Sequence, residues 1–117
     1  MTDHTPALVH QIYGYLRGKA RMRSTVTYTL LQKELGIDRP YGALTPLLDE
    51  CAALSLDQED VVLPAIVVNK ESGVPGGKFD APTGFWKFCQ DQGRDLGDNK
   101  YEFAVKEQVR VFEAYGS

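Results

Sequence analysis

The chain has 117 residues, of which 43% are hydrophobic and 25% charged, which suits one folded domain with one core. No apolar run reaches the roughly 20 residues of a membrane span, and the first residues lack the basic and apolar regions of a signal peptide, so we expect a cytoplasmic protein that does not contact a membrane. The net charge of -3 argues against a protein that grips nucleic acid through bulk positive charge. The two cysteines, Cys51 and Cys89, form no motif and are expected to be reduced thiols.

The first predicted helix begins near Thr5, which can cap it with Pro6 in the first position. Apolar residues at helical spacing give it a core-facing side: Leu8, Ile12, Tyr15 and Leu16. Gly18 is placed to end the helix. The basic residues around and after it should form an exposed connector: Arg17, Lys19, Arg21 and Arg23.

A second helix follows a short strand that the β-branched residues of 24–27 predict. Thr27 is its candidate N-cap and Gly36 its stop signal. Its apolar stripe consists of Leu30, Leu31 and Leu35. We expect this to be a short helix with a cap at each end.

A third helix follows the turn at residues 38–40. Its apolar residues recur every three or four positions: Leu44, Leu47, Leu48, Cys51 and Leu54. Pro46 leaves two alternatives, because a proline removes one hydrogen bond in a helix interior. Either the helix begins at Thr45 with Pro46 in its first position, or it bends at Pro46. An acidic loop over residues 57–60 should end the segment.

Residues 63–68, Leu-Pro-Ala-Ile-Val-Val, are a continuous apolar run of strand length that predicts a buried strand. The glycines and proline of residues 71–77 predict a turn or hairpin tip. Lys78 and Phe79 can form a short return strand. Together these segments predict a β-hairpin of the kind called a wing.

Two further helices are expected at the C-terminal end. Thr83 can cap the first, whose apolar residues are Phe85, Trp86, Phe88 and Cys89 and which ends at Gly93. Asn99 and Glu102 resemble a capping box at the start of the second. The core-facing side of this last helix is predicted to contain Tyr101, Val105, Val109, Phe112 and Tyr115.

The predicted fold is therefore mainly α with a small β component, in a single domain over residues 1–117. A winged-helix-like three-helix core with a short β-hairpin wing occupies about residues 5–79. Two C-terminal helices cover it over about residues 80–117.

Two segments within this core resemble sequences of one known family. Residues 27–36, Thr-Tyr-Thr-Leu-Leu-Gln-Lys-Glu-Leu-Gly, are similar to Thr-Tyr-Gly-x-(Leu/Ile)-Ala-x-x-Leu-Gly. Residues 64–68, Pro-Ala-Ile-Val-Val, with Gly73 after them, are similar in spacing to Pro-Cys-His-Arg-Val-Val and its following glycine. Both patterns belong to the DNA-binding domain of the DNA alkyltransferases that repair O-alkylated guanine, and of their non-enzymatic alkyltransferase-like relatives. The resemblance implies a winged-helix domain that binds DNA.

The chain departs from this family at the residues that carry its chemistry. In the resemblance, Ala65 stands at the alkyl-accepting cysteine, Ile66 at the activating histidine and Val67 at the next arginine. A thiolate nucleophile needs a sulfur and a group that lowers its pKa, and none of these remains. The family's base-stack arginine aligns with Gly42, and Tyr28 matches a residue that contacts the DNA backbone. The resemblance therefore implies DNA binding without alkyl transfer.

No other enzymatic constellation stands out. The two histidines, His4 and His10, have no cysteine or carboxylate pair at metal-ligand spacing. We therefore expect no enzymatic activity, no cofactor and no metal site.

Two functions remain open. The first is a non-catalytic module that binds double-stranded DNA with its third helix in a groove and its basic residues on phosphates, through Arg21, Arg23, Tyr28, Gly42, Ala43, Lys70 and Lys78. Residues 1–40 carry six basic and three acidic groups, so this end of the chain favours phosphate, although a solvated basic loop explains the excess equally well. The second is a regulatory or inhibitory protein–protein interaction module, which binds a partner or a second copy through aromatic residues of the C-terminal helices: Trp86, Phe103 and Tyr115.

Overall fold

The computed structural model describes residues 5–37, 41–70, 73, 85–95, 97 and 99–116. In chain order its elements are α1 (Thr5–Arg21), β1 (Val26–Thr27), α2 (Tyr28–Leu35), α3 (Tyr41–Glu59), the 3-10 helix η1 (Leu63–Ile66), β2 (Val67–Val68), α4 (Phe85–Asp91) and α5 (Lys100–Tyr115). The protein is mainly helical with a small sheet, which confirms the predicted fold class at this level. Within these ranges, no helix has the length and apolar character needed to cross a membrane.

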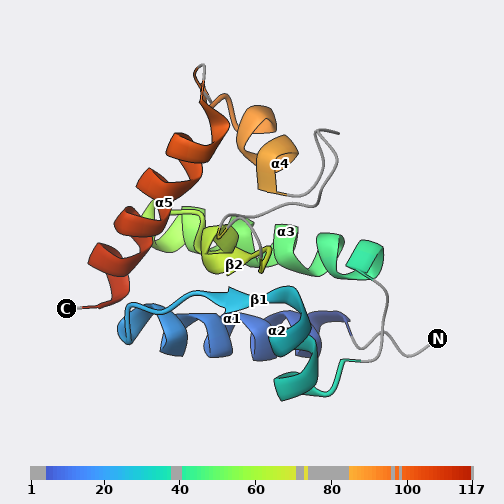
Figure 1. Ribbon diagram of the computed structural model, residues 1–117. Coiled ribbons are helices and arrows are strands. Elements are labelled where there is room, and N and C mark those ends of the chain that lie inside the picture. Colours follow the sequence, from blue (N-terminus) through green and yellow to red (C-terminus); the bar gives the residue numbers. More distant parts are fainter. Residues whose placement is uncertain are drawn as a thin grey trace.

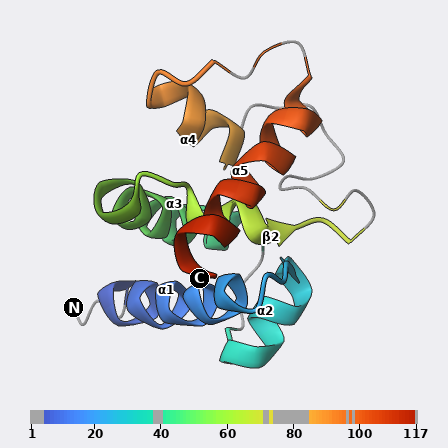
Figure 2. The same cartoon turned by 90° about the vertical axis from the view of Figure 1, so that its left-hand side faces the viewer.

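The short helix η1 lies at the centre of the fold, where it contacts α1, α3 and α5. Figure 1 shows α1 and α2 on one side of the molecule and α4 on the other, with α3 between them. In the turned view, α5 runs across α3 from the level of α4 to the end of α1 (Figure 2). The fully buried side chains come from these packed elements: Ile12, Leu16, Leu31, Leu44, Leu47, Leu63, Ile66 and Val111.

The apolar run at residues 63–68 is buried as expected, but most of it is not a strand. Residues 63–66 form η1, and only Val67 and Val68 form β2. Pro64 suits a tight turn because its φ is fixed near the helical value, and the Ala65 N–H closes the turn on the Val62 carbonyl at 3.0 Å. A short apolar run does not distinguish a buried strand from a buried helical turn, which is why the prediction was wrong here.

The two strands pair in parallel, with Val26 opposite Val67 and Thr27 opposite Val68. A wing hairpin would instead join two antiparallel strands through its tip. The predicted wing and Lys78 lie in residues 71–72 and 74–84, outside the described parts of the chain. The winged-helix fold therefore stays a prediction.

Helix α1 continues past Gly18, where we expected it to end, and finishes at Arg21. Leu16 and Ala20 are both fully buried, and their shared burial offsets the cost of a glycine inside the helix. The helix ends because Arg23 adopts a left-handed φ of 54° and the Ser24 N–H donates to the Lys19 carbonyl. The expected exposed connector is therefore largely the last turn of α1.

Helix α3 begins at Tyr41 and includes Pro46, so of the two alternatives the start at Thr45 was wrong. Pro46 lies on the exposed side, where water can take the place of the lost hydrogen bond. The helix also continues to Glu59, through most of the acidic loop expected at residues 57–60. Asp60, with a left-handed φ of 56°, follows its last residue.

The predicted caps of α2 and α5 are confirmed, whereas Thr83, the predicted cap of α4, lies outside the described residues. The Thr27 hydroxyl accepts from the Leu30 N–H at 3.1 Å, and Gly36 ends α2 with φ 65°. Gly93, with φ 79°, follows α4, and Asn99 caps α5. The prediction of a buried apolar stripe on α2 was partly wrong, because Leu30 is 41% exposed.

Helix α5 turns a partly polar face toward the core: Phe112 and Tyr115 pack against it as predicted, but the other three residues of the predicted face do not. Tyr101, Val105 and Val109 are exposed, whereas Glu107 and Gln108 are buried. Gln108 donates to the Ala65 and Gly73 carbonyls, both at 3.0 Å, and Glu107 accepts from the Val62 N–H. The irregular backbone around η1 needs polar partners, and these two side chains supply them.

Candidate functional site

The parallel register of β1 and β2 brings two of the predicted DNA-binding residues to the same end of the sheet. Tyr28 follows Thr27 at the start of α2, and Lys70 lies two residues after Val68, the pairing partner of Thr27. Lys33 is exposed in the last turn of the same helix. We call the set of Tyr28, Lys33 and Lys70, which lie on α2 or near its start, the α2 edge. Sequence reasoning did not assign Lys33 to a site, although its position in the helix was evident.

Arg21 and Arg23 lie at the opposite end of the sheet, because both precede β1. A Cβ on Gly116 would lie 3.3 Å from Arg23 Nε, which places this arginine beside the last turn of α5. Arg17 lies deeper, with its guanidinium carbon 5.5 Å from the ring centroid of Tyr13 and 6.0 Å from that of Tyr115. The basic residues therefore divide between two surfaces.

Helix α3 contains four acidic residues and no lysine or arginine: Asp49, Glu50, Asp57 and Glu59. All four fall after its second turn, whereas residues 41–48 are uncharged. Gly42 and Ala43 belong to this uncharged part, and only their backbone is described. The first two turns of α3 are thus the part of this helix that could approach a phosphate backbone without repulsion.

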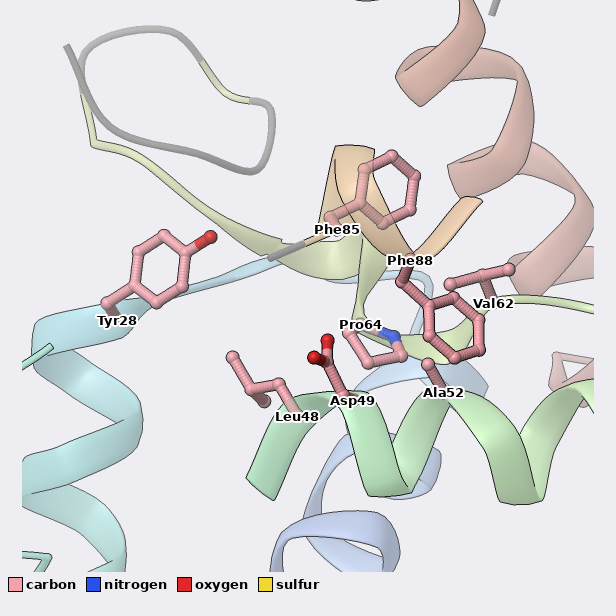
Figure 3. Close-up of a pocket in the computed structure, with 8 residues that line it drawn as sticks. All are labelled: Tyr28, Leu48, Asp49, Ala52, Val62, Pro64, Phe85 and Phe88. Atoms are coloured by element: carbon pink, nitrogen blue, oxygen red, sulfur yellow. The ribbon is translucent and has the colours of Figure 1, made fainter. Parts of the chain in front are cut away.

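A small pocket opens between the start of α2, the middle of α3, η1 and α4. It is lined by Tyr28, Leu48, Asp49, Ala52, Val62, Pro64, Phe85 and Phe88. Figure 3 shows the Asp49 carboxylate rising from α3 into the pocket, with the Tyr28 hydroxyl directed toward the same space. The cavity volume is about 30 Å³, roughly twice what one water molecule needs. The pocket therefore fits a small polar head group and is too small for a nucleotide or a large cofactor.

The Asp49 carboxylate is the charged group of this pocket. Burial raises its pKa above the ordinary value of 3.8, with smaller contributions from Asp91 and Glu50, while Lys87 acts in the opposite direction. Among the residues described, no donor forms a hydrogen bond or ion pair with Asp49. Lys87 instead pairs with Asp91 at 3.1 Å. A carboxylate between apolar walls gains free energy from any donor that reaches it.

Sequence analysis missed this pocket, although its charged residue left a signal. Asp49 directly follows buried Leu48 and stands three residues before buried Ala52, so the helical period already placed it at the edge of the core-facing side. The other walls come from α2, η1 and α4, which only the tertiary structure brings to α3.

Two other kinds of site find no support in the described residues. Burial raises the pKa of the Cys51 and Cys89 thiols to about 12, so neither is a thiolate near neutral pH. Across the described ranges, no three His, Cys, Asp or Glu side chains lie close enough to hold a metal ion. Ala65, which stands at the cysteine position in the alkyltransferase resemblance, is fully buried.

The aromatic residues expected to form a protein-binding surface are half-buried. Trp86, Phe88 and Phe103 pack against the cluster around Phe85, and Tyr115 packs against the main core. The exposed apolar side chains of the C-terminal region are instead Tyr101, Val105 and Val109, at 55%, 37% and 49% exposure. They follow one another every four residues along α5 and form a continuous stripe, which we call the α5 stripe.

Comparisons with models of protein families, with curated proteins and with solved structures found no match. The resemblance to the alkyltransferase DNA-binding domain therefore stays a prediction. Any function has to be argued from the chain's own residues and their arrangement.

Proposed function

We propose that the protein is a non-catalytic DNA-binding module that contacts the phosphate backbone through the α2 edge. The observation that carries this proposal is the register of β1 with β2, which brings Lys70 and Tyr28 to the same end of the sheet. Neither α2 nor α3 has an acidic residue in its first turn. Helix N-termini bear a partial positive charge, so both helix starts favour a nearby phosphate.

The arrangement of α2 and α3 supports a groove contact. Residues 36–40 join the end of α2, where Lys33 lies, to the start of α3. Lys33 and Lys70 mark the two ends of α2, which has eight residues and is about 12 Å long. The uncharged first turns of α3, with Gly42 and Ala43, would then approach the groove while the lysines hold the phosphates on either side.

The proposal implies weak and strongly salt-dependent binding. Two or three phosphate contacts correspond to a slope of about -2 to -3 in log affinity against log salt. Affinity should then fall about 10- to 40-fold between 50 and 200 mM salt. The acidic second half of α3 further limits the affinity for DNA, because its carboxylates repel the phosphates of a longer contact.

The test is a titration of the protein into labelled double-stranded DNA at several salt concentrations. The double variant Lys33→Ala/Lys70→Ala should reduce the slope by about 2. Two controls accompany it. Lys106→Ala removes an exposed lysine on α5, and Arg21→Ala/Arg23→Ala removes two cations at the opposite end of the sheet; both should leave the slope nearly unchanged. Absence of binding at low salt, or equal losses in all three variants, would overturn the proposal.

A second function, protein–protein interaction, is favoured by the α5 stripe. Exposed apolar residues are common singly, but three at four-residue spacing form a face that a second helix can cover. A symmetric pairing of two α5 helices would bury the stripe against itself. Sedimentation equilibrium should then show a monomer–dimer equilibrium that Val105→Glu abolishes, with Glu113→Gln on the same helix as control. A monomer at every concentration would exclude self-association through this face.

A further inference from the structure

The pocket between α2, α3, η1 and α4 has one charged group and walls that suit a cation. Asp49 provides the charge, and Leu48, Pro64 and Ala52 provide aliphatic contacts. The aromatic rings of Tyr28, Phe85 and Phe88 complete the lining, and their faces attract positive charge. A cation with a short apolar stem would therefore satisfy both the carboxylate and the walls.

The charges around the pocket favour the same kind of ligand. Glu50 and Asp91 lie close enough to act on Asp49, and the nearby Lys87 is held by Asp91 at 3.1 Å. Helix α3 contributes acidic side chains and no basic ones to its exposed surface. The carboxylates around Asp49 therefore make the α3 side of the pocket mouth negative, which attracts cations.

We propose that this pocket holds the cationic end of a lysine or arginine side chain from a basic segment of a partner protein. The ammonium or guanidinium donates to the Asp49 carboxylate, and its alkyl stem lies against Pro64 and Leu48. The cavity volume of about 30 Å³ suits such a head group. This inference does not rest on the proposed DNA contact: Tyr28 belongs to both the pocket and the α2 edge, but neither Lys33 nor Lys70 lines the pocket.

The test uses small probes that carry only the recognised chemistry. Propylguanidinium and butylammonium are titrated into isotope-labelled protein, and amide shifts at Asp49, Ala52 and Val62 are followed by NMR. Butanol, which has a similar stem and no charge, serves as the ligand control. We expect saturable shifts with both cations and none with butanol, because a charged donor bonds a carboxylate more strongly than a hydroxyl does.

Three variants decide the assignment. Asp49→Asn should weaken probe binding at least about 10-fold, since a charged partner of a hydrogen bond is lost. Phe88→Leu keeps the apolar wall without the ring and should weaken binding by a smaller factor. Asp57→Asn removes an exposed carboxylate two turns further along α3 and should change nothing. The far-UV circular dichroism of each variant shows that it is folded.

Two results would overturn the proposal. The first is equal binding of the cations by the wild type and Asp49→Asn, which would assign the shifts to nonspecific association with the acidic surface. The second is a saturable response to cytidine with none to either cation, which would assign the pocket to a nucleobase.

Discussion

Replacing Glu107 by glutamine should destabilise the protein, although the two side chains are almost the same size. The Glu107 side chain is 3% exposed, and three donors converge on its two oxygens. Oε2 accepts from the Val62 N–H at 2.7 Å, while Oε1 accepts from Arg94 Nη1 at 2.9 Å and Arg110 Nη1 at 3.0 Å. Glutamine has one acceptor and one donor in these positions. Whichever way its amide turns, at least one buried donor faces an NH2 group.

The expected magnitude depends on the hydrogen bonds that each substitution removes. A buried donor without a partner costs about 1–3 kcal/mol, and the missing charge on the acceptor weakens the remaining bonds, so we expect Glu107→Gln to cost about 2–4 kcal/mol. Glu107→Ala removes all three bonds and leaves the mostly buried Arg94 without this partner, which should cost about 3–5 kcal/mol. The control is Glu102→Gln, whose ion pair with Lys106 is exposed and should contribute only about 0.3–0.5 kcal/mol.

Urea unfolding measures these differences directly. Far-UV circular dichroism reports the helices, and the fluorescence of Trp86, the single tryptophan, reports the region around α4. Coincident curves from the two probes would support a two-state analysis. A loss below about 0.5 kcal/mol for Glu107→Gln, equal to that of Glu102→Gln, would refute the argument that Glu107 anchors η1 to α5.

Two further substitutions test other parts of the structure. Arg23→Gly should stabilise the protein by about 0.5–1 kcal/mol in thermal unfolding, because a left-handed φ of 54° strains arginine and not glycine. Arg21→Gly, at the last residue of α1, should bring no such gain. A loss of stability in Arg23→Gly would contradict the assigned helix end. The pKa of Asp49 is raised in the folded state, so the wild-type protein loses stability as this carboxyl ionises between pH 3.8 and 7. Asparagine does not ionise, so Asp49→Asn should become more stable relative to the wild type over the same rise in pH. Urea unfolding across this range measures the difference, and a difference that does not change with pH would contradict the partly buried position of the carboxyl.

The candidate site could be predicted from the sequence only in fragments. The resemblance and the charge pattern pointed to Tyr28 and Lys70, but the sequence did not show that they share an edge while Arg21 and Arg23 lie at the other end of the sheet. That division depends on the parallel pairing of Val26 with Val67, a contact between residues far apart in the chain. The pocket around Asp49 likewise needs walls from four separate elements.

The sequence by itself determined the features that depend on neighbouring residues. Thr27 caps α2 and Gly36 ends it, because a hydroxyl bonds an N–H three residues away and glycine accepts a left-handed φ without strain. The apolar period of α3 and the cap at Asn99 were predictable for the same local reason. Burial of residues 63–68 also followed from their composition.

Only the tertiary structure decided which backbone conformation residues 63–68 adopt and which face of α5 turns inward. Once η1 replaces a strand, its N–H and C=O groups have no ladder to pair with and must find side chains. Glu107 and Gln108 meet that need, so they face the core and the more apolar stripe at Tyr101, Val105 and Val109 faces outward. An apolar pattern cannot show this outcome, because it does not record which backbone groups elsewhere in the fold need a partner.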